Sequence, residues 1–98
     1  MESSIMESRL EFEFNEIQRQ ENVTGCVLAD PKGLCLLASP NIKNEVAGLV
    51  TAIAQHASLI EPSGNTQPIV LLENDTRQCL IHCDEGITTA IFKKIQNN

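Results

Sequence analysis

The sequence predicts one α+β domain, in which a largely antiparallel sheet packs against helices. Two turn signatures, Asp30–Gly33 (DPKG) and Asp84–Gly86 (DEG), each join two apolar, β-rich runs, as in hairpins. Two longer segments have the apolar periodicity of helices instead of the alternation of strands. A length of 98 residues with 42% hydrophobic residues suits a single domain, residues 1–98, with a modest core.

The first expected helix covers the polar N-terminal segment, residues 1–21. Met6, Leu10, Phe14 and Ile17 recur at intervals of four, four and three residues, so they lie on one face of a helix. Glutamates in the first turns suit the positive end of the helix dipole. We interpret the acidic residues as a solvated face, with a surface that steers a basic partner as the alternative.

The sheet and a central helix are expected between residues 22 and 94, followed by a polar tail, residues 95–98. One hairpin joins residues 23–30 to residues 34–38, and a second joins 78–83 to 87–94. A further strand is the apolar run 69–72, which a turn at residues 74–76 joins to residues 78–83 as a third hairpin. The order is therefore α-β-β-α-β-β-β, and its three tight connections predict an antiparallel sheet of five strands with helices on its faces.

The central helix, residues 46–60 (VAGLVTAIAQHASLI), has no charged residue in a chain that is 20% charged. A helical wheel places Val46, Leu49, Val50, Ile53, Ala57 and Ile60 on a central apolar stripe. Three further alanines and Leu59 widen this stripe, which leaves Gly48, Thr51, Gln55 and Ser58 for the far side. An apolar arc this wide predicts that the helix packs on its own domain and also against a second molecule.

The run Ile69-Val70-Leu71-Leu72 allows two interpretations. It is either a central core strand or an edge strand that pairs with the sheet of a partner, the mode called β-augmentation. We favour the paired edge, because an exposed apolar edge strand aggregates unless it is covered.

Composition excludes several classes of function. A net charge of −6 argues against unaided binding to nucleic acid or to an anionic membrane, because both require a basic patch. No apolar segment reaches the length of a membrane span, and the termini match neither a signal peptide nor a lipidation site. We therefore expect a cytoplasmic chain that does not insert into membranes, with reduced cysteines.

No residue pattern indicates a catalytic, cofactor-binding or metal site. The segment Cys79–Cys83 (CLIHC) has zinc-binding residue types, but on a strand its histidine points away from its cysteines. Cys26 and Cys35 lie on hairpin partners, where a disulfide is unexpected in the cytosol. A small thiol-dependent enzyme that uses Cys79 or Cys83 with a histidine is the least favoured hypothesis.

Four segments, VTGCVLADPKGLCL, EVAGLVTAIAQHA, PIVLLEND and HCDEGITTAIFKK, resemble in this order the roadblock/LC7 superfamily, and within it the small subunits of the Ragulator complex. The resemblance covers about residues 22–94 and implies the roadblock fold without the C-terminal helix that other members carry. The cysteines and Glu85 depart from the family pattern.

The resemblance also implies dimerisation through the second helix and the third strand, which join two sheets into one. The corresponding positions are Ala47, Val50, Thr51, Ala54 and Ser58 in the helix, and Ile69, Val70, Leu71 and Leu72 in the strand.

In function, the resemblance implies a non-enzymatic scaffold subunit without cofactors, peripheral on the late endosome and lysosome surface. Its partners would be another roadblock-fold subunit and a lipidated scaffold chain, and through them the Rag GTPases of TOR kinase amino-acid signalling. The alternative is a roadblock homodimer that regulates a small GTPase or acts as a motor-associated adaptor.

Overall fold

The computed structural model describes residues 2–60 and 67–95, with side chains from residue 8 onward. Its elements are α1 (Glu2–Gln18), β1 (Val23–Ala29), β2 (Cys35–Ala38), α2 (Glu45–Ile60), β3 (Val70–Glu73), β4 (Arg77–Asp84) and β5 (Ile87–Lys94). This order confirms the predicted α-β-β-α-β-β-β arrangement. Residues 61–66 and most of the expected tail, residues 96–98, lie outside the described residues.

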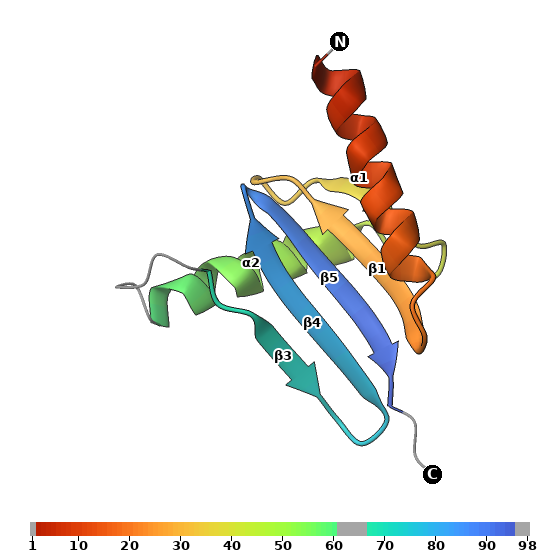
Figure 1. Ribbon diagram of the computed structural model, residues 1–98. Coiled ribbons are helices and arrows are strands. Elements are labelled where there is room, and N and C mark those ends of the chain that lie inside the picture. Colours follow the sequence, from red (N-terminus) through yellow and green to blue (C-terminus); the bar gives the residue numbers. More distant parts are fainter. Residues whose placement is uncertain (1, 61–66, 96–98) are drawn as a thin grey trace.

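The five strands form one antiparallel sheet in the order β2-β1-β5-β4-β3. Three of its pairings are the predicted hairpins, β1–β2, β3–β4 and β4–β5. The fourth joins β1 to β5, which brings the first and last strands of the chain together in the middle of the sheet (Figure 1). The free edges of the sheet are therefore β2 and β3.

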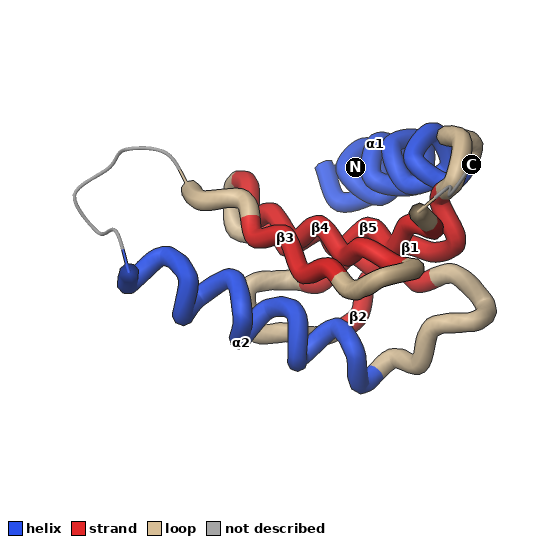
Figure 2. Tube along the Cα trace, turned by 90° about the horizontal axis from the view of Figure 1, so that it is seen from below, coloured by secondary structure: helices blue, strands red, loops and turns tan. Residues whose placement is uncertain are grey.

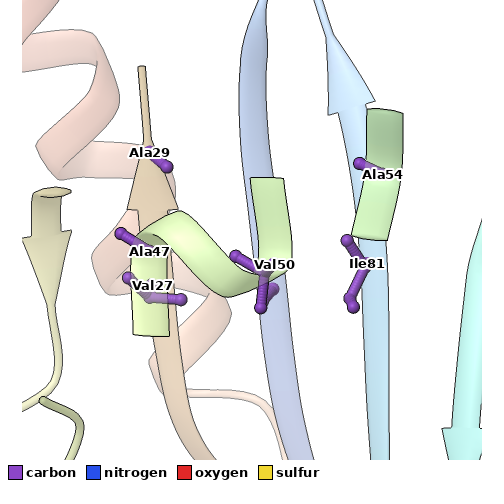
Figure 3. Packing of buried hydrophobic residues seen from close by; sticks show 7 residues of the cluster. Val27, Ala29, Ala47, Val50, Ala54 and Ile81 are labelled. Carbon is purple, nitrogen blue, oxygen red and sulfur yellow. The ribbon is translucent and has the colours of Figure 1, made fainter. Parts of the chain in front are cut away.

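The sheet lies between the two helices, with α1 on one face and α2 on the other (Figure 2). On the α1 face, Phe14 is buried together with Cys26 and Leu28 of β1. The larger cluster lies on the α2 face, where Ala47, Val50 and Ala54 pack against Val27 and Ala29 of β1 and Ile81 of β4 (Figure 3). Phe12, off the predicted stripe of the first helix, is 65% exposed.

Both turn signatures form the predicted hairpins. The carboxylate of Asp30 accepts hydrogen bonds from the backbone N–H groups of Lys32 and Leu34, each at 2.9 Å. Gly33 has a φ of +89°, which a side chain would disfavour. Glu85 and Gly86 have φ values of +52° and +83°, as a tight two-residue hairpin turn requires.

Helix α2 meets the sheet with a different face from the one that the wheel placed at the centre. Its buried residues are Ala47, Val50, Thr51 and Ala54. Thr51, expected on the far side, is 4% exposed, and its hydroxyl donates to the Ala47 carbonyl at 2.8 Å. This hydrogen bond lets the threonine be buried, and the small side chains let the helix approach the sheet closely. Leu49, expected at the centre of the stripe, points outward instead and is 63% exposed.

Candidate partner-binding surface

One side of α2 presents an apolar stripe that the chain itself leaves uncovered. Leu49, Ile53, His56 and Ile60 recur at intervals of four, three and four residues. Leu49, His56 and Ile60 are exposed, and Ile53 is half-buried. This spacing is the one by which helices pack against each other. The predicted excess of apolar surface on this helix is therefore present in the fold.

The stripe adjoins the edge strand β3. A groove of about 350 Å³ lies between them and is lined by Ala52, Ile53, His56, Ala57, Ile60 and Val70. The C-terminal end of α2 extends beyond the sheet at the β3 side, as both Figure 1 and Figure 2 show. Hence the end of the helix lacks a covering strand, and Leu59 and Ile60 are 72% and 82% exposed.

Strand β3 has one neighbour, β4, and its other edge is unpaired within the described chain. The interpretation of Ile69–Leu72 as a central core strand is wrong, and its placement at an edge is confirmed. Val70 packs against the core, whereas Ile69, Leu71 and Leu72 are exposed. We define the α2–β3 surface as the residues Leu49, Ala52, Ile53, His56, Ala57, Leu59, Ile60 and Ile69–Leu72.

The structure divides the nine expected interface residues into two groups. The four strand residues lie at the free edge, and Ser58 is half-buried on α2. Ala47, Val50, Thr51 and Ala54 are instead covered by the chain's own sheet. The apolar side chains that α2 leaves accessible are those of the stripe beside these four residues. A wheel alone cannot show this, since it finds an apolar arc but not its orientation.

The opposite face of the sheet is covered by α1 mainly over β1. On this face, Leu71, Leu80 and Ile91 are aligned across β3, β4 and β5, and Ile91 packs against the α1-side cluster. Leu71 is 51% exposed, and Leu80 and Ile91 are half-buried. Beside this row, a groove of about 410 Å³ is lined by Arg9, Leu10, Glu13, Leu28, His82, Asp84, Glu85, Ile87 and Thr89.

The cysteines are placed for packing. Cys79 and Cys83 pack against the α2-side core, while His82 lines the groove beside α1, so the predicted alternation is confirmed. Cys26 and Cys35 pack in clusters on opposite faces of the sheet, and both are free thiols. Burial raises the pKa of the Cys26, Cys35 and Cys79 thiols, the reverse of what a reactive thiolate needs. Within the described residues, no three metal-ligating side chains come together.

Comparison with known families accounts for this combination of sheet and helices. The model of the family described as "Ragulator complex protein LAMTOR5" matches residues 6–93. The chain belongs to this family. Its LAMTOR5 relatives include a homologue from Nematostella vectensis, 31% identical over 90% of this chain and 97% of that protein. Another, from Ixodes scapularis, is 34% identical over 69% of this chain and 75% of that protein.

Solved structures place the LAMTOR5-family chain in the roadblock/LC7 fold. The roadblock/LC7 domain from Streptomyces avermitilis superposes with a TM-score of 0.65 at 20% identity, over 80% of this chain and 71% of that one. MglB of Myxococcus xanthus superposes with a TM-score of 0.72 at 12% identity, over 85% and 73% of the two chains. At these identities the likeness concerns the fold, and it confirms the predicted architecture. Among the described residues, neither helix is long and apolar enough to span a bilayer.

Proposed function

We propose that this LAMTOR5-family chain is a non-enzymatic scaffold subunit of a Ragulator-like complex, and that its α2–β3 surface binds another roadblock-fold subunit. The observation that carries the proposal is the position of an exposed apolar helix stripe beside an unpaired apolar strand edge. The two features call for the same kind of partner, one that supplies both a strand and a helix.

The strand edge would join the two sheets. Backbone N–H and C=O groups on the outer side of β3 have no strand to pair with in this chain. A strand of the partner would satisfy them and cover Leu71 and Leu72. The five-stranded sheet would then continue into the sheet of the partner.

The helix stripe would supply most of the binding energy. Its residues, Leu49, Ile53, His56 and Ile60, include no carboxylate or amine, so covering them desolvates little charge. If about 600 Å² of apolar surface is covered, the gross gain is on the order of 15 kcal/mol before the costs of association. Since association costs about 4–15 kcal/mol, the net affinity depends on how closely the partner packs against this stripe.

A second partner would cover the α1-side face of the sheet. On this face Leu71 is exposed and Leu80 is half-buried, and a groove lies between α1 and strands β4 and β5. We propose that a lipidated scaffold chain lies here and holds the subunit at the late endosome and lysosome surface. In this arrangement the chain would support Rag GTPases and TOR kinase amino-acid signalling through its partners.

The proposal is tested by co-expression with a candidate roadblock-fold subunit from the same organism. Leu49→Glu places a charge on the α2–β3 surface, whereas Gln55→Glu places the same charge on an exposed position of α2 outside it. Leu49 is 63% exposed, so both variants should fold. Leu49→Glu should weaken the complex by about 2 kcal/mol or more, roughly thirtyfold in Kd, and Gln55→Glu should leave it unchanged.

Mass in solution provides the second readout. A 1:1 complex with the other subunit supports the scaffold proposal. Equal co-purification of Leu49→Glu and Gln55→Glu would place the interface elsewhere. A homodimer that persists when the candidate subunit is present in excess would favour the homodimeric regulator instead.

A further inference from the structure

The sheet has a second free edge, β2, at the end opposite to β3. Leu34, immediately before this strand, is 64% exposed, and Leu36 within it is 41% exposed. The register of β1 and β2 shifts so that Leu28 faces Leu37 and Ala29 faces Cys35. Leu36 therefore has no direct partner on β1, and such irregularities redirect a side chain.

Leu36 takes part in a groove between α1 and β2. The groove has a volume of about 310 Å³ and is lined by Leu10, Glu11, Leu36 and Leu37. Three of these residues are leucines and the fourth is an acid, so the groove combines an apolar floor with one carboxylate. It lies on the side of α1 away from the groove that Glu13 lines.

Glu11 differs from the other described acids in the middle of α1. Glu13 pairs with Arg9 at 3.5 Å, and Glu16 pairs with Arg19 at 3.2 Å. Among the residues whose side chains are described, Glu11 has no such cationic partner. Its carboxylate is exposed at the groove, in a chain with a net charge of −6. The complementary ligand is therefore a cation attached to an apolar segment.

We propose that the groove between α1 and β2 is a second docking site, which binds an extended basic and apolar segment of another protein chain. The segment would add a strand to the outer edge of β2. On that strand, side chains two positions apart share a face. One apolar side chain would contact Leu36 and Leu37, and a lysine or arginine two positions away would pair with Glu11.

This site extends the proposed function without depending on it, because it lies at the opposite edge of the sheet from β3. With both edges occupied, the chain would connect two neighbours in one assembly. Charge complementarity at Glu11 selects a basic segment over a second copy of this acidic chain.

A displayed library of short random peptides tests the site on the full chain, immobilised alone and, in a parallel selection, together with a roadblock-fold partner. On the wild type, peptides with an apolar residue two positions from lysine or arginine should be enriched. They should exceed peptides with aspartate or glutamate at that position by about two- to fivefold, the size of a favourable exposed charge pair. Glu11→Lys should reverse this preference, and Leu36→Asp should abolish enrichment of both classes. Glu21→Lys, an exposed change outside the groove, is the matched control.

The proposal is overturned if no basic class is enriched on the wild type, or if Glu11→Lys leaves the preference unchanged. The proposal is also overturned if a second copy of this chain occupies the groove. In that case the wild-type protein would double its mass in solution, and Leu36→Asp would prevent the doubling. Glu11→Lys is expected to leave binding of the roadblock-fold partner intact. Failure of this inference is therefore distinguishable from failure of the α2–β3 proposal.

Discussion

Ile53 of α2 and Val70 of β3 line the same groove, and both also pack against the α2-side core. The helix stripe and the strand edge are therefore held in fixed positions relative to each other. A partner that pairs with β3 must pass over the end of α2, which extends beyond the sheet on this side (Figure 1). The helix stripe and the strand edge therefore form one continuous surface.

Hydrogen exchange should show the pairing of β3 directly. Without a partner, outward-facing amides of Val70–Glu73 are open to solvent, and binding of a roadblock-fold subunit should slow their exchange by about tenfold or more. Strand β2, the other free edge, is the internal control and should be unaffected by this partner. Exchange that is unchanged at β3 in a stable complex would contradict strand addition.

A pair of glycine substitutions tests the packing of α2 against the first hairpin. A Cβ at Gly33, where φ is +89°, would lie 3.3 Å from the Cα of Gly48. Gly33→Ala should therefore lower the free energy of unfolding by about 1–2 kcal/mol. A Cβ at Gly48 finds its nearest atom at 3.8 Å, so Gly48→Ala should raise this free energy by up to about 1 kcal/mol, as expected within a helix. Urea unfolding measures the free energy of unfolding of both variants. A change of the same sign in the two variants would refute the packing argument.

Ser39 connects α1 to the sheet. Its buried hydroxyl accepts a hydrogen bond from the Cys26 N–H at 2.9 Å and donates one to the side-chain oxygen of Gln18 at 2.5 Å. Ser39→Ala leaves the Cys26 N–H without its hydroxyl partner and should cost about 1–3 kcal/mol of stability. Ser58→Ala removes only a hydroxyl that bonds to the Gln55 carbonyl of the same helix, and it should cost less than about 0.5 kcal/mol. Chemical denaturation measures the free energy of unfolding of both variants. Equal losses of stability would contradict the role given to the Ser39 hydroxyl.

The thiol of Cys26 should lower the stability of the protein as the pH rises into the alkaline range. Burial raises the pKa of this thiol from 9.0 to about 11. The folded state therefore holds the thiol proton more tightly than the unfolded state. The stability that the neutral thiol contributes is complete below pH 9 and is lost between pH 9 and about 11. Over this pH interval, the free energy of unfolding of the wild type should fall by about 2 kcal/mol more than that of Cys26→Ala. If the unfolding free energies of the two proteins changed equally with pH, the Cys26 thiol would not contribute to the pH dependence of stability.

Local sequence signals predicted most of the elements. The Asp30–Gly33 and Asp84–Gly86 turns depend on residues that favour particular backbone angles, so their hairpins could be predicted without tertiary information. Strand β5 has the expected bounds, Ile87–Lys94, because a turn and a polar tail flank it. The excess of apolar residues on α2 was likewise visible from the sequence of this segment and its helical wheel.

The orientation of α2 was not predictable in this way. A wheel sums hydrophobicity around the axis, whereas the sheet selects the face that approaches it most closely. Ala47, Thr51 and Ala54 are small enough to lie against the sheet, so they are buried, and the larger Leu49 and Ile60 remain exposed. Four of the five expected helix positions are therefore buried in this chain, and the exposed apolar residues form the neighbouring stripe.

The sequence by itself determined the element order, the three hairpins and the surplus of apolar surface, because each depends on residues close together in the chain. The pairing of β1 with β5, the edge positions of β2 and β3, and the choice of which α2 residues face outward were decided by the tertiary structure. These features arise from contacts between segments far apart in sequence, whose free energies depend on how the whole sheet and its helices pack together.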